Sequence, residues 1–128
     1  MKIKTNRTFI IDHKFEDVDS IIKFHFKIPA SEDVDYTELR KKLYAGDEIK
    51  TEDTKTPGAY NAYLYSLRTA LVKCEGIEDE NGKPIIITDN DGVINEDYQI
   101  AVFELIKFDT ELMKKVVVAY TGVSEKNF

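Results

Sequence analysis

The chain contains few of the residues that form covalent cross-links, metal sites or catalytic centres. Its 128 residues include a single cysteine, Cys74, so no disulfide can form within the chain, and a reducing compartment is expected. The two histidines, His13 and His25, lack the HxxxH spacing of metal ligands. A glycine-rich phosphate loop, a GxSxG motif and a paired-carboxylate signature are also missing. The sequence therefore predicts a protein that is not an enzyme and that uses no cofactor or metal.

Positive charge and long apolar runs are scarce as well. Lysine and arginine number 18 against 24 aspartates and glutamates, which gives a net charge of −6. A general nucleic-acid binder needs a basic face that displaces counterions, so this class is disfavoured. No apolar run is long enough to cross a membrane, and the first residues lack the apolar core of a signal peptide. We expect no nucleic-acid or membrane partner and a cytoplasmic location.

The first thirty residues have the composition of β-strands. The segment "SIIKFHFKI" alternates, with Ile22, Phe24, Phe26 and Ile28 on one face and His25 on the other. The segment "RTFIIDH" before it is equally rich in β-branched and aromatic residues. We expect an antiparallel ribbon over residues 1–30, with both histidines facing solvent and an apolar face that helices cover.

Residues 31–122 are expected to be mainly helical, followed by a tail over residues 123–128. A first helix is predicted over residues 35–46, and a second over residues 56–75 because its apolar residues recur at three- and four-residue spacing. That stripe contains Tyr60, Tyr63, Leu64, Leu67, Leu71 and Cys74. On this stripe Cys74 is expected to be a buried, inert thiol.

After the second helix, Asn81-Gly82 signals a turn, and a short strand is predicted near residues 85–88. The last helix is expected to start at Asn95 and to break near Asp109, which caps a second segment that Gly122 ends. We find no internal repeat. The sequence predicts one α+β domain over residues 1–128, with a ribbon of two to three strands packed on three to four helices.

The acidic stretch "TDNDGVINEDY", residues 88–98, resembles a calcium loop at first sight. Aligning Gly92 with the invariant glycine of an EF-hand loop places Ile87 at position 1 and Tyr98 at position 12, where oxygen ligands are needed. Because both end ligands fail, we interpret residues 89–92 as a turn and Asn95 as a helix cap. Glu96 and Asp97 then lie in the first helical turn, where the helix dipole favours negative charge.

Aromatic side chains are the best candidates for a partner surface. The chain has no tryptophan but seven tyrosines and seven phenylalanines. Both core and interface positions favour such residues, so the two roles stay open at this point. The candidates on the predicted helices are Tyr60, Tyr63, Tyr65, Phe103 and Phe108.

The connection between the second and the last helix carries a recognisable pattern. Its residues fit the sequence aromatic-x-Gly-[Val/Ile]-x-Asp-x-x-Gly-x-Pro-[Ile/Val] at Gly76, Ile77, Asp79, Gly82, Pro84 and Ile85. The segment "FKIPASEDVDYTELRKKLYAGD" upstream has the F-x-I-P start and the following helix of the same family. In these features the chain resembles the tail assembly chaperones of long-tailed bacteriophages and prophages. It departs from them at Cys74-Glu75, where an aromatic residue is common.

The resemblance implies a non-catalytic role in the cytoplasm of a host bacterium. Such chaperones bind the long tape-measure protein, and the tail tube protein is a further possible partner. They keep the tape-measure protein soluble while the tail tube is assembled around it, and they are absent from the finished particle. A homo-oligomer is left open. The alternative is another phage structural protein retained in the virion, such as a tail-tube, tail-completion or connector component.

Overall fold

The computed structural model describes residues 7–28 and 58–125, with the side chains of 58–62 and 123–125 left out. The expected helix over residues 35–46 lies outside these ranges. The described elements are three strands and three helices, in the order β1, β2, α2, β3, α3 and α4. The strands form one antiparallel sheet, which confirms the predicted α+β class.

The N-terminal ribbon forms as the alternation predicts. Strands β1 (Thr8–His13) and β2 (Ile22–Lys27) pair antiparallel, with Phe9 opposite Phe26 and their rings stacked at 4.8 Å between centroids. The apolar face of the second strand is buried, and Phe24 is 0% exposed. The burial of this face is the largest favourable term available to the ribbon, because a two-stranded ribbon alone is marginal in water.

The third strand arises where the sequence predicted the end of a helix. Helix α2 spans Gly58–Ala70, and the chain then continues as strand β3, Leu71–Glu75, which pairs with β2. Leu71 and Cys74 lie three residues apart, which is a helical spacing, yet both are buried. A β-bulge reconciles the two facts: Leu71 pairs with Phe26 and Lys73 with His25, so Val72 is the extra residue. The bulge returns both apolar side chains to the same face of the sheet.

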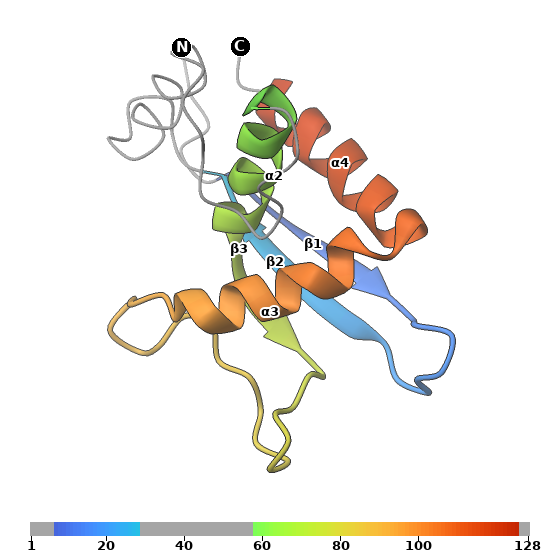
Figure 1. Ribbon diagram of the computed structural model, residues 1–128, viewed down its shortest axis with the longest axis vertical. Helices are drawn as coiled ribbons and strands as arrows, with labels where there is room; N and C mark the ends of the chain where they lie inside the picture. Colours follow the sequence, from blue (N-terminus) through green and yellow to red (C-terminus); the bar gives the residue numbers. More distant parts are fainter. Residues whose placement is uncertain (1–6, 29–57, 126–128) are drawn as a thin grey trace.

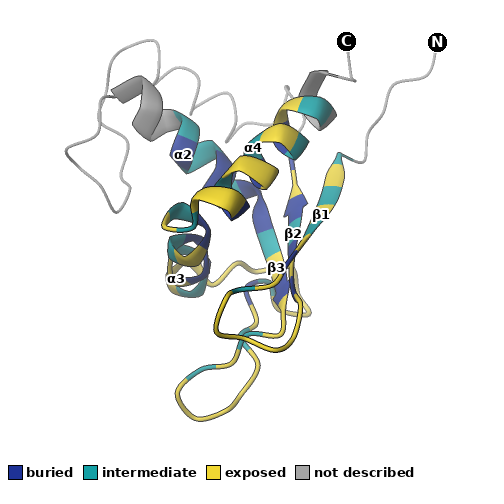
Figure 2. Cartoon of the chain, turned by 90° about the vertical axis from the view of Figure 1, so that its right-hand side faces the viewer, coloured by how far each residue is buried: buried dark blue, intermediate teal, exposed yellow. Residues whose placement is uncertain are grey.

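Helices α2, α3 and α4 cover one face of the sheet (Figure 1) and bury the core between the two layers (Figure 2). Helix α3 (Glu96–Lys107) begins at Asn95, whose side chain accepts from the Tyr98 N–H. Helix α4 (Thr110–Glu125) begins after Asp109, whose carboxylate accepts from the Leu112 N–H at 2.9 Å. Both predicted caps and the predicted break are confirmed.

Besides the second helix, which ends at Ala70 and not at residue 75, two further boundary predictions are wrong. Helix α4 continues through Gly122 to Glu125, because a glycine lowers helix propensity without forcing the chain to leave the helix. The expected strand near residues 85–88 is reduced to isolated bridges, since its backbone groups close turns: Ile85 N–H bonds to the Ile77 carbonyl, and the Ile87 carbonyl accepts from Asn95. Among the helices described, none has the length and apolarity needed to cross a membrane.

Candidate functional site: a double turn and an apolar groove

The connection between β3 and α3 consists of two successive turns with the same hydrogen-bond pattern. In the first, the Asp79 carboxylate accepts from the N–H groups of Asn81 and Lys83 at 2.8 and 3.0 Å. In the second, the Asp89 carboxylate accepts from Asp91 and Val93, both at 2.9 Å. Each donor and acceptor of the second turn lies ten positions after its counterpart in the first. We call residues 77–95 the double turn.

The double turn is a short internal repeat that the sequence analysis missed. Its signal was visible as Asp-x-Asn-Gly followed by Asp-x-Asp-Gly, with glycines at the same place in each turn. Gly82 and Gly92 adopt φ angles of 77° and 80°, which side chains other than glycine rarely tolerate. The bridges Glu78 to Pro84 and Thr88 to Ile94 repeat at the same interval.

The acidic stretch at residues 88–98 forms the second turn and the N-terminal cap of α3. Asp89 bonds to backbone N–H groups of its own turn, and Asn95 caps α3. This confirms the interpretation of residues 89–92 as a turn. In the part of the chain that the structure describes, no group of three or more histidine, cysteine, aspartate or glutamate side chains is placed to hold a metal ion.

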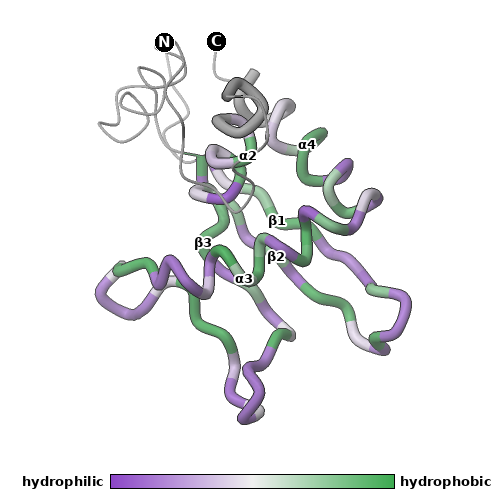
Figure 3. Tube along the Cα trace, in the orientation of Figure 1, coloured by the Kyte–Doolittle hydropathy of each residue, from purple (hydrophilic) through white to green (hydrophobic). Residues whose placement is uncertain are grey.

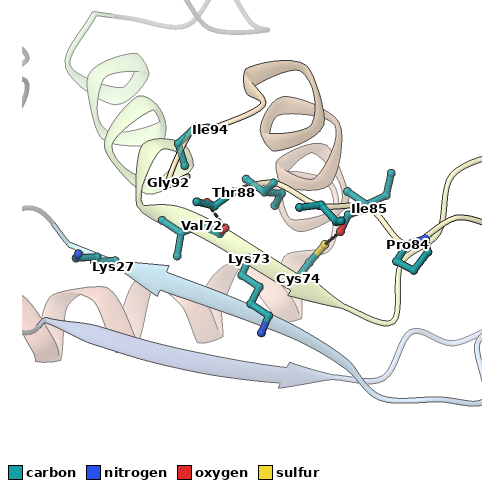
Figure 4. Close-up of a pocket in the computed structure, with 11 residues that line it drawn as sticks. Lys27, Val72, Lys73, Cys74, Pro84, Ile85, Thr88, Gly92 and Ile94 are labelled. Carbon is teal, nitrogen blue, oxygen red and sulfur yellow. Dashed lines mark hydrogen bonds between the residues drawn. The ribbon is translucent and has the colours of Figure 1, made fainter. Parts of the chain in front are cut away.

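An apolar groove of about 650 Å³ lies between β3 and the double turn (Figure 4). Its lining residues come from the end of β2, from β3 and from the double turn: Lys27, Val72, Lys73, Cys74, Pro84, Ile85, Ile86, Ile87, Thr88, Gly92 and Ile94. We call it the β3 groove. The segment that joins the first turn to the second is hydrophobic, whereas the first turn itself is hydrophilic (Figure 3).

Two hydrogen bonds hold the double turn against β3 and so shape the groove. The Thr88 hydroxyl donates to the Val72 carbonyl at 2.6 Å, and the Cys74 thiol lies 3.8 Å from the Ile85 carbonyl (Figure 4). Ile87 is buried beneath the groove at 1% exposure, while Ile86 and Ile94 remain 60% and 37% exposed. The double turn thus buries Ile87 in the core, packs Ile77 and Ile85 partly against it, and presents other apolar side chains to solvent.

The predicted aromatic candidates do not gather at one place. Phe103 is 0% exposed in the core, so its assignment to a partner surface is wrong, whereas Phe108 is 78% exposed at the bend between α3 and α4. Tyr63 and Tyr65 are half-buried: Tyr63 packs edge-on against Tyr120, and Tyr65 lies under the Arg68 guanidinium. Burial raises the pKa of the Tyr63 hydroxyl. Tyr60 lies on α2, and its side chain is outside the described set.

His13 corrects the expectation that both histidines face solvent. It is 4% exposed, with Asp109 Oδ2 at 3.2 Å from Nε2 and Lys115 Nζ at 3.1 Å from Nδ1. Because an ammonium group only donates, Nδ1 accepts from Lys115 and Nε2–H donates to Asp109. The pKa of Asp109 is lowered, first by the Leu112 N–H and then by the hydrogen bond from His13. The cluster joins β1 to the bend between α3 and α4.

His25 and Cys74 occupy the opposite faces of the sheet. His25 is 23% exposed and bonds through Nε2 to Glu75 Oε2 at 2.6 Å, which lowers the pKa of Glu75. Cys74 is buried as predicted, and its burial raises the pKa of the thiol, with the Glu75 charge adding to the effect. A raised pKa leaves less of the reactive thiolate, as an inert thiol requires.

Comparison of the chain with protein-family models, with curated proteins and with solved structures finds no match. The function is therefore argued from the residues and their geometry.

Proposed function

We propose that this protein is a tail assembly chaperone of a long-tailed bacteriophage or prophage. In this role it binds the tape-measure protein in the host cytoplasm and keeps it dispersed while the tail tube assembles. The observation that carries the proposal is the double turn: the motif of the family resemblance, residues 76–85, forms its first turn, and the last two motif residues, Pro84 and Ile85, line an exposed apolar groove.

The other motif residues shape the first turn or the chain just before it. Gly76 has a φ angle of 94°, which side chains other than glycine rarely tolerate, and a Cβ there would lie 2.9 Å from Ile22 Cδ1, so the Ile22 side chain would have to shift. Asp79 and Gly82 form the first turn, and Pro84 bridges to Glu78. These glycine, aspartate and proline residues fix the backbone of a surface turn and supply no reactive group, which fits a binding protein.

The charge and surface of the chain fit the task of keeping an aggregation-prone client dispersed. Exposed apolar side chains, such as Ile86 at 60% and Phe108 at 78%, offer contacts for the apolar stripe of a helical client. The net charge of −6 makes complexes of this protein repel one another. Apolar contact and charge repulsion together give a soluble complex.

Coexpression tests the proposal. The proposal predicts that a long, helix-rich partner is encoded shortly downstream, and this protein is to be expressed alone and with the present chain. We expect the long protein to move from the pellet to the soluble fraction and to elute with this chain in size-exclusion chromatography. An unchanged pellet together with the absence of a complex would overturn the proposal. Detection of this chain in purified particles by mass spectrometry would support the alternative, a component retained in the virion.

A further inference from the structure

We infer that the β3 groove binds an extended segment in which apolar side chains alternate with acidic ones. The inference rests on the proposed function in that the segment would belong to the client. The site itself is argued from the charges, the backbone hydrogen bonds and the apolar lining of the groove.

The charge of the groove differs in sign from that of the whole protein. Among the described residues that line it, Lys27 and Lys73 are charged and none is acidic, although the chain carries a net charge of −6. Neighbouring charges on the same open face of the sheet are paired: Lys23 with Asp12 at 3.1 Å, and His25 with Glu75 at 2.6 Å. Within the described residues neither Lys27 nor Lys73 forms an ion pair, although the charge of Lys73 helps to lower the pKa of Glu75. Two lysines beside an apolar groove complement carboxylates that flank apolar side chains.

The backbone of β3 decides how such a segment binds. An exposed strand edge commonly accepts a peptide as an added strand. Here two carbonyls at the start of β3 are already used, because Leu71 O accepts from Gln99 Nε2 at 2.8 Å and Val72 O accepts from the Thr88 hydroxyl at 2.6 Å. These bonds disfavour strand addition at this end of β3, so we expect the partner to be recognised by its side chains.

The apolar part of the groove suits side chains of a peptide. Its volume of about 650 Å³ falls within the range of roughly 300–1,000 Å³ that is typical of binding sites. Val72, Ile85, Ile86 and Ile94 supply aliphatic contacts on two sides. A second copy of this chain fits less well, because two chains of charge −6 repel each other.

Fluorescence anisotropy with a designed peptide tests the inference. The probe is a labelled peptide in which glutamate alternates with leucine and phenylalanine, and the control peptide carries lysine in place of every glutamate. We expect the acidic peptide to bind the full chain at least tenfold more tightly than the basic one, and more weakly at high salt. Equal binding of both peptides, or no binding of either, would overturn the inference.

Matched variants locate the binding site. We expect Lys73→Glu and Ile86→Asp each to weaken binding of the acidic peptide at least tenfold. The controls are Lys114→Glu, an exposed lysine on α4, and Val118→Asp, whose parent side chain is 65% exposed against 60% for Ile86. These controls should bind as the natural chain does. Equal weakening in controls and groove variants, or none in either, would contradict the site, and circular dichroism checks that each variant is folded.

The two proposals fail separately. If the acidic peptide binds but coexpression gives no complex with the long protein, the proposed function is wrong and the β3 groove still binds peptides. A soluble complex that survives both Lys73→Glu and Ile86→Asp would remove the groove as the client site and leave the proposed function. A concentration-dependent dimer that Ile86→Asp abolishes, measured by analytical ultracentrifugation, would assign the groove to a second copy instead.

Discussion

At the scale of single residues, Asp109 joins three parts of the molecule. One carboxylate oxygen accepts from the Leu112 N–H and caps α4, and the other accepts from His13 of β1. The cap was predictable from the sequence because donor and acceptor lie three residues apart. The contact with His13 was not, since 96 residues separate the two side chains and only the packing of α4 on β1 brings them together.

Asp109 should make stability depend on pH in acid. Its folded-state pKa is lowered, so its contribution is fully present above the unfolded value near 4 and is lost as the pH falls through the lowered value. Asparagine can keep the cap without the charge, so we expect Asp109→Asn to cost about 1 kcal/mol at neutral pH. The difference in free energy of unfolding between Asp109→Asn and the natural chain, measured by urea titration, should shrink below about pH 4.

If the stability difference between Asp109→Asn and the natural chain stayed constant between pH 7 and pH 3, the Asp109 carboxylate would not be the origin of the acid sensitivity. Asp91→Asn, at an exposed position in the second turn, is the control. Its stability difference from the natural chain should be within about 0.5 kcal/mol at neutral pH.

At the scale of elements, the double turn and β3 show how much local sequence decides. The turns follow from Asp-x-Asn-Gly and Asp-x-Asp-Gly, because the carboxylate bonds and the positive φ angles are local. Strand β3 does not follow from local sequence, since Leu71 and Cys74 have helical spacing. The partner strand β2 and the bulge at Val72 decide its conformation.

The two turns should respond equally to loss of their glycines. Among the described residues, a Cβ at Gly92 would meet no atom within 4 Å, and one at Gly82 would meet only Glu78 Oε2 at 3.7 Å, so we expect the cost to be backbone strain. We expect Gly82→Ala and Gly92→Ala each to lower the free energy of unfolding by about 1–2 kcal/mol in urea denaturation.

Gly122→Ala is the matched control of opposite sign. Gly122 lies inside α4, and no atom of the described residues would lie within 4 Å of a Cβ there, so alanine should stabilise the helix by about 0.5–1 kcal/mol. A neutral result at Gly82 and Gly92 would show that these turns tolerate a side chain, and the strain argument would be wrong.

At the scale of the whole molecule, one hydrophobic cluster connects both layers. It contains Phe24 from β2, Leu67 from α2, Leu71 from β3, Phe103 from α3 and Val116 from α4. Because the described elements share these contacts, none of them keeps its packing when another unfolds.

We therefore expect one cooperative unfolding transition. Far-ultraviolet circular dichroism of the helices and the near-ultraviolet signal of the tyrosines should give the same urea midpoint. Phe103→Ala should shift both signals together and cost about 3–5 kcal/mol, whereas Phe108→Ala, at a 78% exposed position, should change stability by less than about 0.5 kcal/mol. Helical signal that persists beyond the tyrosine transition would contradict a single cooperative unit.

The sequence by itself determined the features that depend on neighbours within a few residues. These are the alternation of β2, the caps at Asn95 and Asp109, and the two turns, all of which use short-range hydrogen bonds or a repeating side-chain period. Tertiary structure decided that β3 is a strand, that His13 and Phe103 are buried and that Phe108 is exposed. It also formed the β3 groove, since Lys27, Val72 and Ile86 come from three separate segments. Burial and cavities depend on contacts between distant parts of the chain, and no local pattern encodes them.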